Sequence, residues 1–213
     1  MNLSKYLLTT VLFFLSLLIV PIWAQTTWVV NTIDDNDDGT CDAGHCSLRE
    51  AINASNGNAG ADIISFNIGG TAPFVIEPIS PLPAITDPMT TIDGSTQPAY
   101  TMGDITIDGA NTIPNSHGLD IGASNTEIYG LKIVNFDISN NAGINVGANT
   151  QLTDIVIGGP NRGNILGGNH HGIFVSFVSD CNNVTIQSNY VGVDLSAGMA
   201  DIGNTINGIV IMQ

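Results

Sequence analysis

The chain has 213 residues, of which 43% are hydrophobic, so it can bury a sizeable core as one ordinary domain. It carries 4 Lys and Arg against 19 Asp and Glu, which gives a formal net charge of −15. This balance argues against nucleic acid or an anionic membrane as a partner, and an acidic polysaccharide would need a bridging divalent cation.

Residues 1–24 have the composition of a secretory signal peptide. Lys5 supplies the positive charge of the N-terminal region, and residues 7–20 form the apolar region. The segment ends at a small residue, Ala24, as expected for a cleavage site. A membrane anchor is the alternative, but the apolar run is short for a span and Pro21 interrupts it. We therefore expect a secreted or cell-surface protein whose mature chain has no membrane span.

A predicted first strand over residues 28–33 leads into an acidic loop with the residue spacing of a calcium site. Four residues are candidate oxygen ligands: Asp34, Asn36, Asp38 and Asp42. Asp35 is an alternative to Asp42, and Gly39 permits the turn. His45, a poor calcium ligand, stands where an EF-hand has its closing Glu. The alternative to a structural calcium site is a solvated acidic turn.

Two of the three cysteines, Cys41 and Cys46, are close together in an exported chain, which predicts a local disulfide. A zinc site is the alternative; His45 lies nearby, but a fourth ligand is not evident. The remaining Cys181 is expected to be buried in a β coil as a small hydrophobic residue.

The segment from Ser47 to Asn56 is predicted to be the one committed helix of the mature chain. Ser47 is a good N-cap, and Glu50 three residues later completes a capping box. The apolar positions share one face: Leu48, Ala51 and Ile52. The polar positions are expected to point away from it: Arg49, Glu50 and Asn53. One amphipathic helix before a long β-rich region predicts a cap over the open end of stacked strands.

The run from Cys46 to Ala51 reads CSLREA, follows the acidic DDNDDG segment and precedes an apolar strand. It closely resembles the CSLREA domain at the N-termini of secreted bacterial right-handed parallel β-helix proteins of the pectate-lyase-like fold. The resemblance covers residues 26–68, and residues 93–98 and 188–194 are weaker matches to rung motifs of the same proteins. It implies that fold and a location at the cell surface, but no particular reaction.

Beyond the cap, residues 63–68 and 74–76 are predicted strands, and residues 78–88 a Pro-rich extended segment. A loose repeat of Gly, apolar, any residue, apolar then recurs at intervals of 25, 29 and 36 residues. It begins at four glycines: Gly118, Gly143, Gly172 and Gly208. Between these rungs lies a second set of apolar runs: residues 127–133, 154–157 and 184–186. Recurring short strands of this kind predict a solenoid.

In such a solenoid, an Asn beside each apolar run is expected to form a ladder along the turns: Asn135, Asn164 and Asn189. The longest interval predicts a coil with a bulged loop. We therefore expect an all-β chain with a cap at 25–62 and a parallel β-helix over 63–213; a β-sandwich is the competing fold. The sequence stops inside a rung without a polar cap, which predicts an N-terminal fragment of a longer protein.

Catalytic chemistry finds little support in the residues, and none is predicted to be catalytic. A polysaccharide lyase needs a basic residue beside metal-holding carboxylates, but Arg49 belongs to the cap, and Lys132 and Arg162 have no evident Asp cluster in register. A hydrolase needs paired carboxylates. His170 and His171 are interpreted as a turn, as are Asp93 and Asp108.

A non-catalytic role in adhesion or glycan contact asks less of the sequence. Four aromatic residues are candidates for stacking on sugar rings, unless they fill the core: Tyr100, Tyr129, Tyr190 and Phe177. Polysaccharide or cell-surface glycan is therefore the expected partner. The alternatives are a lyase or hydrolase acting on uronate-type polymers, and a purely structural stalk.

Overall fold

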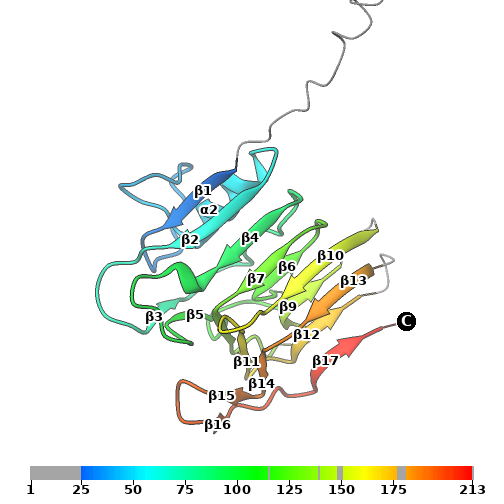
Figure 1. The fold of residues 1–213 in the computed structure, drawn as a ribbon. Helices are drawn as coiled ribbons and strands as arrows, with labels where there is room; N and C mark the ends of the chain where they lie inside the picture. Colours follow the sequence, from blue (N-terminus) through cyan, green and yellow to red (C-terminus); the bar gives the residue numbers. More distant parts are fainter. Residues whose placement is uncertain (1–24, 115, 139, 148–150, 177–180, 213) are drawn as a thin grey trace, which may run out of the picture.

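The computed structural model describes residues 25–114, 116–138, 140–147, 151–176 and 181–212, so the predicted signal peptide lies outside the described residues. These residues form a β-solenoid of about four turns with a single α-helix at its N-terminal end (Figure 1). The predicted parallel β-helix with one capping helix is therefore confirmed.

Three parallel sheets make up the solenoid, and from β2 to β14 each strand lies in a different sheet from the strand before it, because the chain winds around the core. In spatial order, the six-stranded sheet contains β1 (Thr26–Val30), β2 (Asp62–Phe66), β4 (Thr90–Asp93), β7 (Glu127–Tyr129), β10 (Leu152–Ile157) and β13 (Cys181–Ile186). The five-stranded sheet contains β14 (Tyr190–Val191), β11 (Ile165–Gly167), β8 (Leu131–Val134), β5 (Ile105–Asp108) and β3 (Phe74–Ile76). The four-stranded sheet contains β17 (Asn207–Ile211), β12 (His171–Val175), β9 (Ala142–Val146) and β6 (Leu119–Ile121).

The apolar residues of the predicted Gly rungs stack in columns through the core. Ile173 is in register with Ile144 before it and Ile209 after it, and Ile144 is in register with Leu119. Leu119, Ile144 and Ile173 are at most 1% exposed, whereas Ile209 is 46% exposed. The hydrophobic effect therefore stabilises each coil through the coil stacked on it.

The predicted Asn ladder is confirmed for two of its three members. The Nδ2 of Asn164 donates to Oδ1 of Asn189 at 3.0 Å, and the two side chains also bond the backbone at the turn into the five-stranded sheet. Asn135 does not belong to this ladder, because its amide donates to Asp108 Oδ1 at 2.8 Å instead. A second ladder lies at the turn that leaves the five-stranded sheet. It is formed by Asn169 and Asn204, with Asn169 N–H donating to Asn204 Oδ1 at 3.1 Å.

The N-terminal cap is built on α2 (Leu48–Asn56). The capping box is present: Ser47 Oγ accepts the N–H of Glu50, and the Glu50 carboxylate accepts the N–H of Ser47 at 2.8 Å. Leu48 and Ile52 lie in the core as predicted. The prediction that Glu50 points away was wrong, because its side chain is 1% exposed and turns back beneath the acidic loop.

The long interval between the last two Gly rungs contains a small antiparallel hairpin, formed by β15 (Val193–Asp194) and β16 (Ala200–Asp201). It packs on β11, where Ile202 lies against Gly167 and leaves no room for a side chain at that position. The predicted bulged loop therefore forms a hairpin outside the core.

A 3₁₀ turn, η1 (Gly94–Thr96), follows β4.

Candidate functional site

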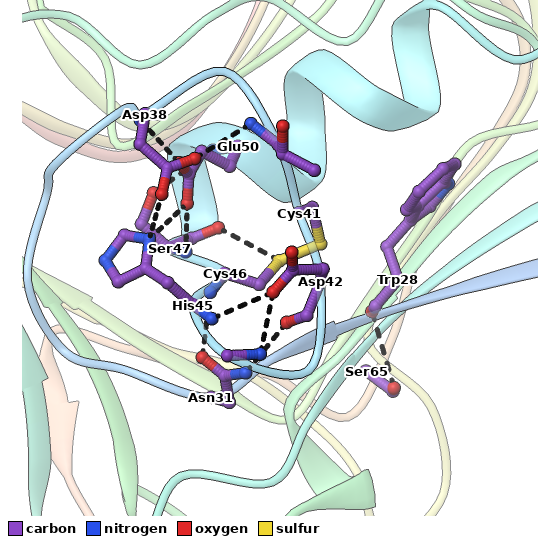
Figure 2. The surroundings of a disulfide bond; sticks show 12 residues. Trp28, Asn31, Asp38, Cys41, Asp42, His45, Cys46, Ser47, Glu50 and Ser65 are labelled. Atoms are coloured by element: carbon purple, nitrogen blue, oxygen red, sulfur yellow. Dashed lines mark hydrogen bonds and ion pairs between the residues drawn. A yellow bond between two sulfur atoms is a disulfide. The ribbon is translucent and has the colours of Figure 1, made fainter.

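The predicted disulfide joins Cys41 to Cys46 just before the helix (Figure 2). Asn31, at the end of β1, holds this loop from both sides: its Nδ2 donates to the Asp42 carbonyl at 3.0 Å, and its Oδ1 accepts the Cys46 N–H at 2.8 Å. Cys181, which was expected to be buried, packs against the core but is only half-buried. The disulfide and Asn31 together fix the acidic loop on the end of the solenoid.

The carboxylates of the predicted calcium loop are each engaged in a local turn. Asp34 accepts the N–H of Asn36, Asp38 that of Thr40, and Asp42 that of Gly44, at 2.7–3.0 Å. Asn36 contributes its carbonyl to Ser47 Oγ at 2.6 Å. Among the described residues, only Asp38 of the four predicted ligands lies in a group with the spacing of a metal site, together with His45 and Glu50. Calcium binding therefore stays a prediction.

His45 lies among three carboxylates, and Figure 2 shows its ring beside Asp38 and Glu50. Its Nε2 is 3.1 Å from Asp34 Oδ1, and its Nδ1 is 2.9 Å from Glu50 Oε2. The contact with Glu50 is an ion pair rather than an aligned hydrogen bond. The hydrogen bond to Asp34 and the charges of Glu50, Asp34 and Asp38 raise the pKa of His45 against the opposing effect of burial.

The pKa of Glu50 moves in the opposite direction. Burial acts to raise it, but the N–H groups of Ser47 and Asp38 and the charge of His45 outweigh burial and lower it. Because Glu50 already accepts two backbone N–H groups, its carboxylate is committed to the cap. The arrangement is suited to holding a protonated imidazole, which ties the acidic loop to the first turn of α2.

The three basic residues weighed for a lyase are each held in an ion pair. Arg49 bonds both carboxylate oxygens of Asp35, Lys132 Nζ lies 2.5 Å from Asp194, and Arg162 Nη1 lies 2.9 Å from Asp93. Asp93 and Asp108 also accept N–H groups two residues ahead, so their predicted turn roles are confirmed.

Of the four aromatic residues considered for sugar stacking, the structure buries Tyr129. Arg162 lies 3.6 Å above the Tyr129 ring, which is 5% exposed and unavailable for stacking on a sugar. Tyr100 is half-buried, and burial raises the pKa of its hydroxyl to about 12. Tyr190 is half-buried in β14, and Phe177 lies outside the described residues. For Tyr129, the alternative of a packing role holds.

A groove of about 440 Å³ lies on the outer face of the five-stranded sheet, beside the β15–β16 hairpin. Its polar lining comes from five residues: Thr106, Asp108, Lys132, Asn135 and Asp194. Its apolar lining includes three others: Val75, Val134 and Ile202. Val75, Thr106 and Lys132 form one row across β3, β5 and β8, because they are in register. The sequence pattern missed this groove because Asp194 is 62 positions from Lys132.

The hairpin wall is held in place by the carboxylate of Asp194. This group bonds Lys132 Nζ, and it also accepts the N–H and hydroxyl of Ser196 at 3.0 and 2.5 Å. Burial acts to raise the pKa of Asp194, but the bonds from Lys132 and Ser196 lower it overall. The ion pair therefore carries no net charge into the groove.

Within the described part of the chain, no helix has the length and apolarity needed to cross a bilayer. Comparison with protein-family models, curated proteins and solved structures finds no match for this chain. The resemblance of residues 26–68 to the CSLREA domain therefore rests on its sequence motif and stays a prediction.

Proposed function

We propose that this protein is an exported, non-catalytic β-solenoid that contacts a neutral glycan through the groove beside the β15–β16 hairpin. The observation that carries the proposal is the lining of the groove. Asp108 and Asn135 offer acceptors and a donor for sugar hydroxyls, and the half-buried Val75 offers apolar surface to the C–H face of a sugar ring.

The charge of the groove favours a neutral glycan over a uronate polymer. Lys132 is neutralised by Asp194, which leaves the carboxylate of Asp108 as the unbalanced charge in the lining. A chain with a net charge of −15 also repels polyanions at long range. A uronate lyase would further require a basic residue that is free to abstract a proton, and Lys132 is held in its ion pair.

The proposal is tested with a matched pair of variants. Asn135 and Asn125 are both exposed and both have positive φ, at 65° and 57°, so glycine is tolerated at either position. Asn135→Gly removes an amide from the groove, and Asn125→Gly makes the same change in another turn. We expect Asn135→Gly to weaken binding of neutral oligosaccharides by about tenfold, the scale of one lost hydrogen bond, and Asn125→Gly to leave it unchanged.

Binding would be measured by calorimetry against neutral oligosaccharides and oligouronates. Tighter binding of oligouronates would overturn the assignment of a neutral ligand. Failure to bind any sugar would favour the structural stalk. Export is tested separately by sequencing the N-terminus of the secreted protein, which is expected to begin at Gln25.

A further inference from the structure

A column of four residues precedes the Gly rungs on the four-stranded sheet. His171, at the start of β12, is in register with Ala142 of the coil before it and Asn207 of the coil after it. His117 precedes the first of these rungs and lies beside Ala142. The column therefore reads His117, Ala142, His171 and Asn207, and it crosses three joints between coils.

Both histidines of the column meet N–H donors from the next coil at the same ring atom. The backbone N–H of Ala142 donates to Nδ1 of His117 at 3.0 Å. The amide Nδ2 of Asn207 lies 3.3 Å from Nδ1 of His171. Each Nδ1 is thus placed to accept, which requires it to be unprotonated. An imidazolium donates from both nitrogens, so protonation removes both inter-coil contacts.

The surroundings offer little compensation for positive charge. Asp120 on β6 faces His117, but it also accepts the amide of Asn145 at 2.7 Å. His170 packs edge-to-face on His171, with 4.6 Å between ring centroids, and Phe174 covers the ring from within β12 at 5.4 Å. Asp137, at the corner between β8 and β9, bonds the Thr205 hydroxyl instead.

Burial lowers the pKa of His117 most strongly, with Asp120 opposing it. Burial also lowers the pKa of His171, and the neighbouring His170 and His117 add to that effect. Next to the column, three side chains have a buried polar atom without a hydrogen-bond partner among the described residues: Ser116, Asn141 and His170. These atoms show that few alternative hydrogen-bond partners are available at this corner of the solenoid if a contact of the column is lost.

We propose that the column is an acid-sensitive joint between coils. Protonation of His117 and His171 converts each Nδ1 from an acceptor into a donor facing a donor, and places two like charges in one column. Acidification then loosens the joints at Ala142 and Asn207 while the apolar columns keep the remaining coils stacked. This device is independent of glycan binding, because none of its residues lines the groove.

The test uses the double variant His117→Asn, His171→Asn. An Asn side chain can place an oxygen acceptor near the position of Nδ1 without titrating, and Asn207 already occupies the same column. Hydrogen exchange at the Ala142 amide, corrected for the intrinsic effect of pH, would be compared at about pH 7.5 and about pH 4.5, because burial lowers the pKa of both histidines below the ordinary His value near 6.5. We expect protection to fall by about tenfold in the natural chain and to stay within about twofold in the variant.

The amide of Ile107 in β5 distinguishes local opening from global unfolding, and its protection should not change. Nitrogen chemical shifts of the natural chain would also show whether His117 Nδ1 gains its proton as Ala142 loses protection, a result that does not depend on the variant. The proposal is overturned if Ala142 stays protected at the lower pH, or if the double variant loses as much protection as the natural chain. Equal loss at Ile107 would likewise overturn it.

Discussion

The first and the last described coils of the solenoid bury the same kind of apolar residue to different extents. At the N-terminal end, α2 and the disulfide-bonded loop cover the first strands, and Val30 and Ile64 are completely buried. In the last described coil, Ile209 and Ile211 are 46% and 64% exposed, although they are in register with the buried Ile173 and Val175. Burial in this fold is therefore a property of the element stacked on a coil, rather than of the residue.

The capped end also uses a different kind of bond. Arg49 of α2 bonds Asp35 in the acidic loop and the carbonyls of Ser80 and Pro81, which lie more than 30 positions away in the chain. The later coils are joined by repeated backbone ladders and by Asn side chains. The cap therefore depends on a few particular side chains, whereas the coils depend on a repeated pattern.

The largest expected effect compares one column position in two coils. Ile144→Ala should lower the free energy of unfolding by about 2–5 kcal/mol, because the side chain is fully buried. Ile209→Ala should cost about 1 kcal/mol or less, because the side chain is already partly hydrated. Urea unfolding followed by circular dichroism measures both. Equal losses would contradict the dependence of burial on stacking.

The disulfide gives the next largest effect. Cys41→Ala with Cys46→Ala should destabilise the protein by roughly 2 kcal/mol, the loop-entropy estimate for so short a loop. Thermal unfolding of the double variant would be compared with that of Cys181→Ala, which keeps the disulfide. Hydrogen exchange should place the increased opening in β1 and α2, and an increase confined to the later coils would be evidence against a local role.

The helix cap is expected to contribute less. Ser47→Ala removes the hydroxyl that accepts the Glu50 N–H and donates to the Asn36 carbonyl, at a cost of about 1 kcal/mol. Ser65→Ala is a suitable control, because its hydroxyl makes only a 3.5 Å contact with the Trp28 carbonyl. Chemical denaturation would measure the free energy of unfolding of both variants. Equal losses would show that the capping box does not stabilise the cap.

The smallest effect is a difference in pH response between the N-terminal cap and the histidine column of the four-stranded sheet. The pKa of His45 is raised, so its contribution to stability is present below the ordinary His value near 6.5 and is lost as pH rises through the raised pKa. The pKa values of His117 and His171 are lowered, so stability is present above 6.5 and is lost as pH falls. The stability of His45→Asn should therefore converge on that of the natural chain as pH rises from 6 to 9, as measured by urea unfolding.

Sequence patterns were sufficient for the features that depend on near neighbours or on repetition. Ser47 and Glu50 are three positions apart, so the capping box and the start of α2 were predictable. The four Gly rungs became β6, β9, β12 and β17, because each rung faces the same column of neighbours.

Features that depend on distant partners were not predictable. The burial of Glu50 arises from the N–H of Asp38 and the ring of His45, which the helical period does not show. Asn135 and Asn164 each stand beside an apolar run, but Asn135 follows its strand and bonds Asp108, which removes it from the ladder. The acidic loop shows the same limit. Its calcium-like spacing does not reveal that Asp34, Asp38 and Asp42 each accept a backbone N–H two residues ahead.

The β15–β16 hairpin has a consequence for how this surface can vary. The rungs recur after 25, 29 and 36 residues, yet the columns Leu119–Ile144–Ile173–Ile209 remain aligned. Extra chain length is absorbed outside the core, where the hairpin forms a wall of the groove. Insertions or deletions between Leu195 and Met199, in the loop that joins β15 to β16, can therefore reshape the wall of the groove without shifting the pairing of any coil, which makes this loop a suitable site for grafting a new binding loop.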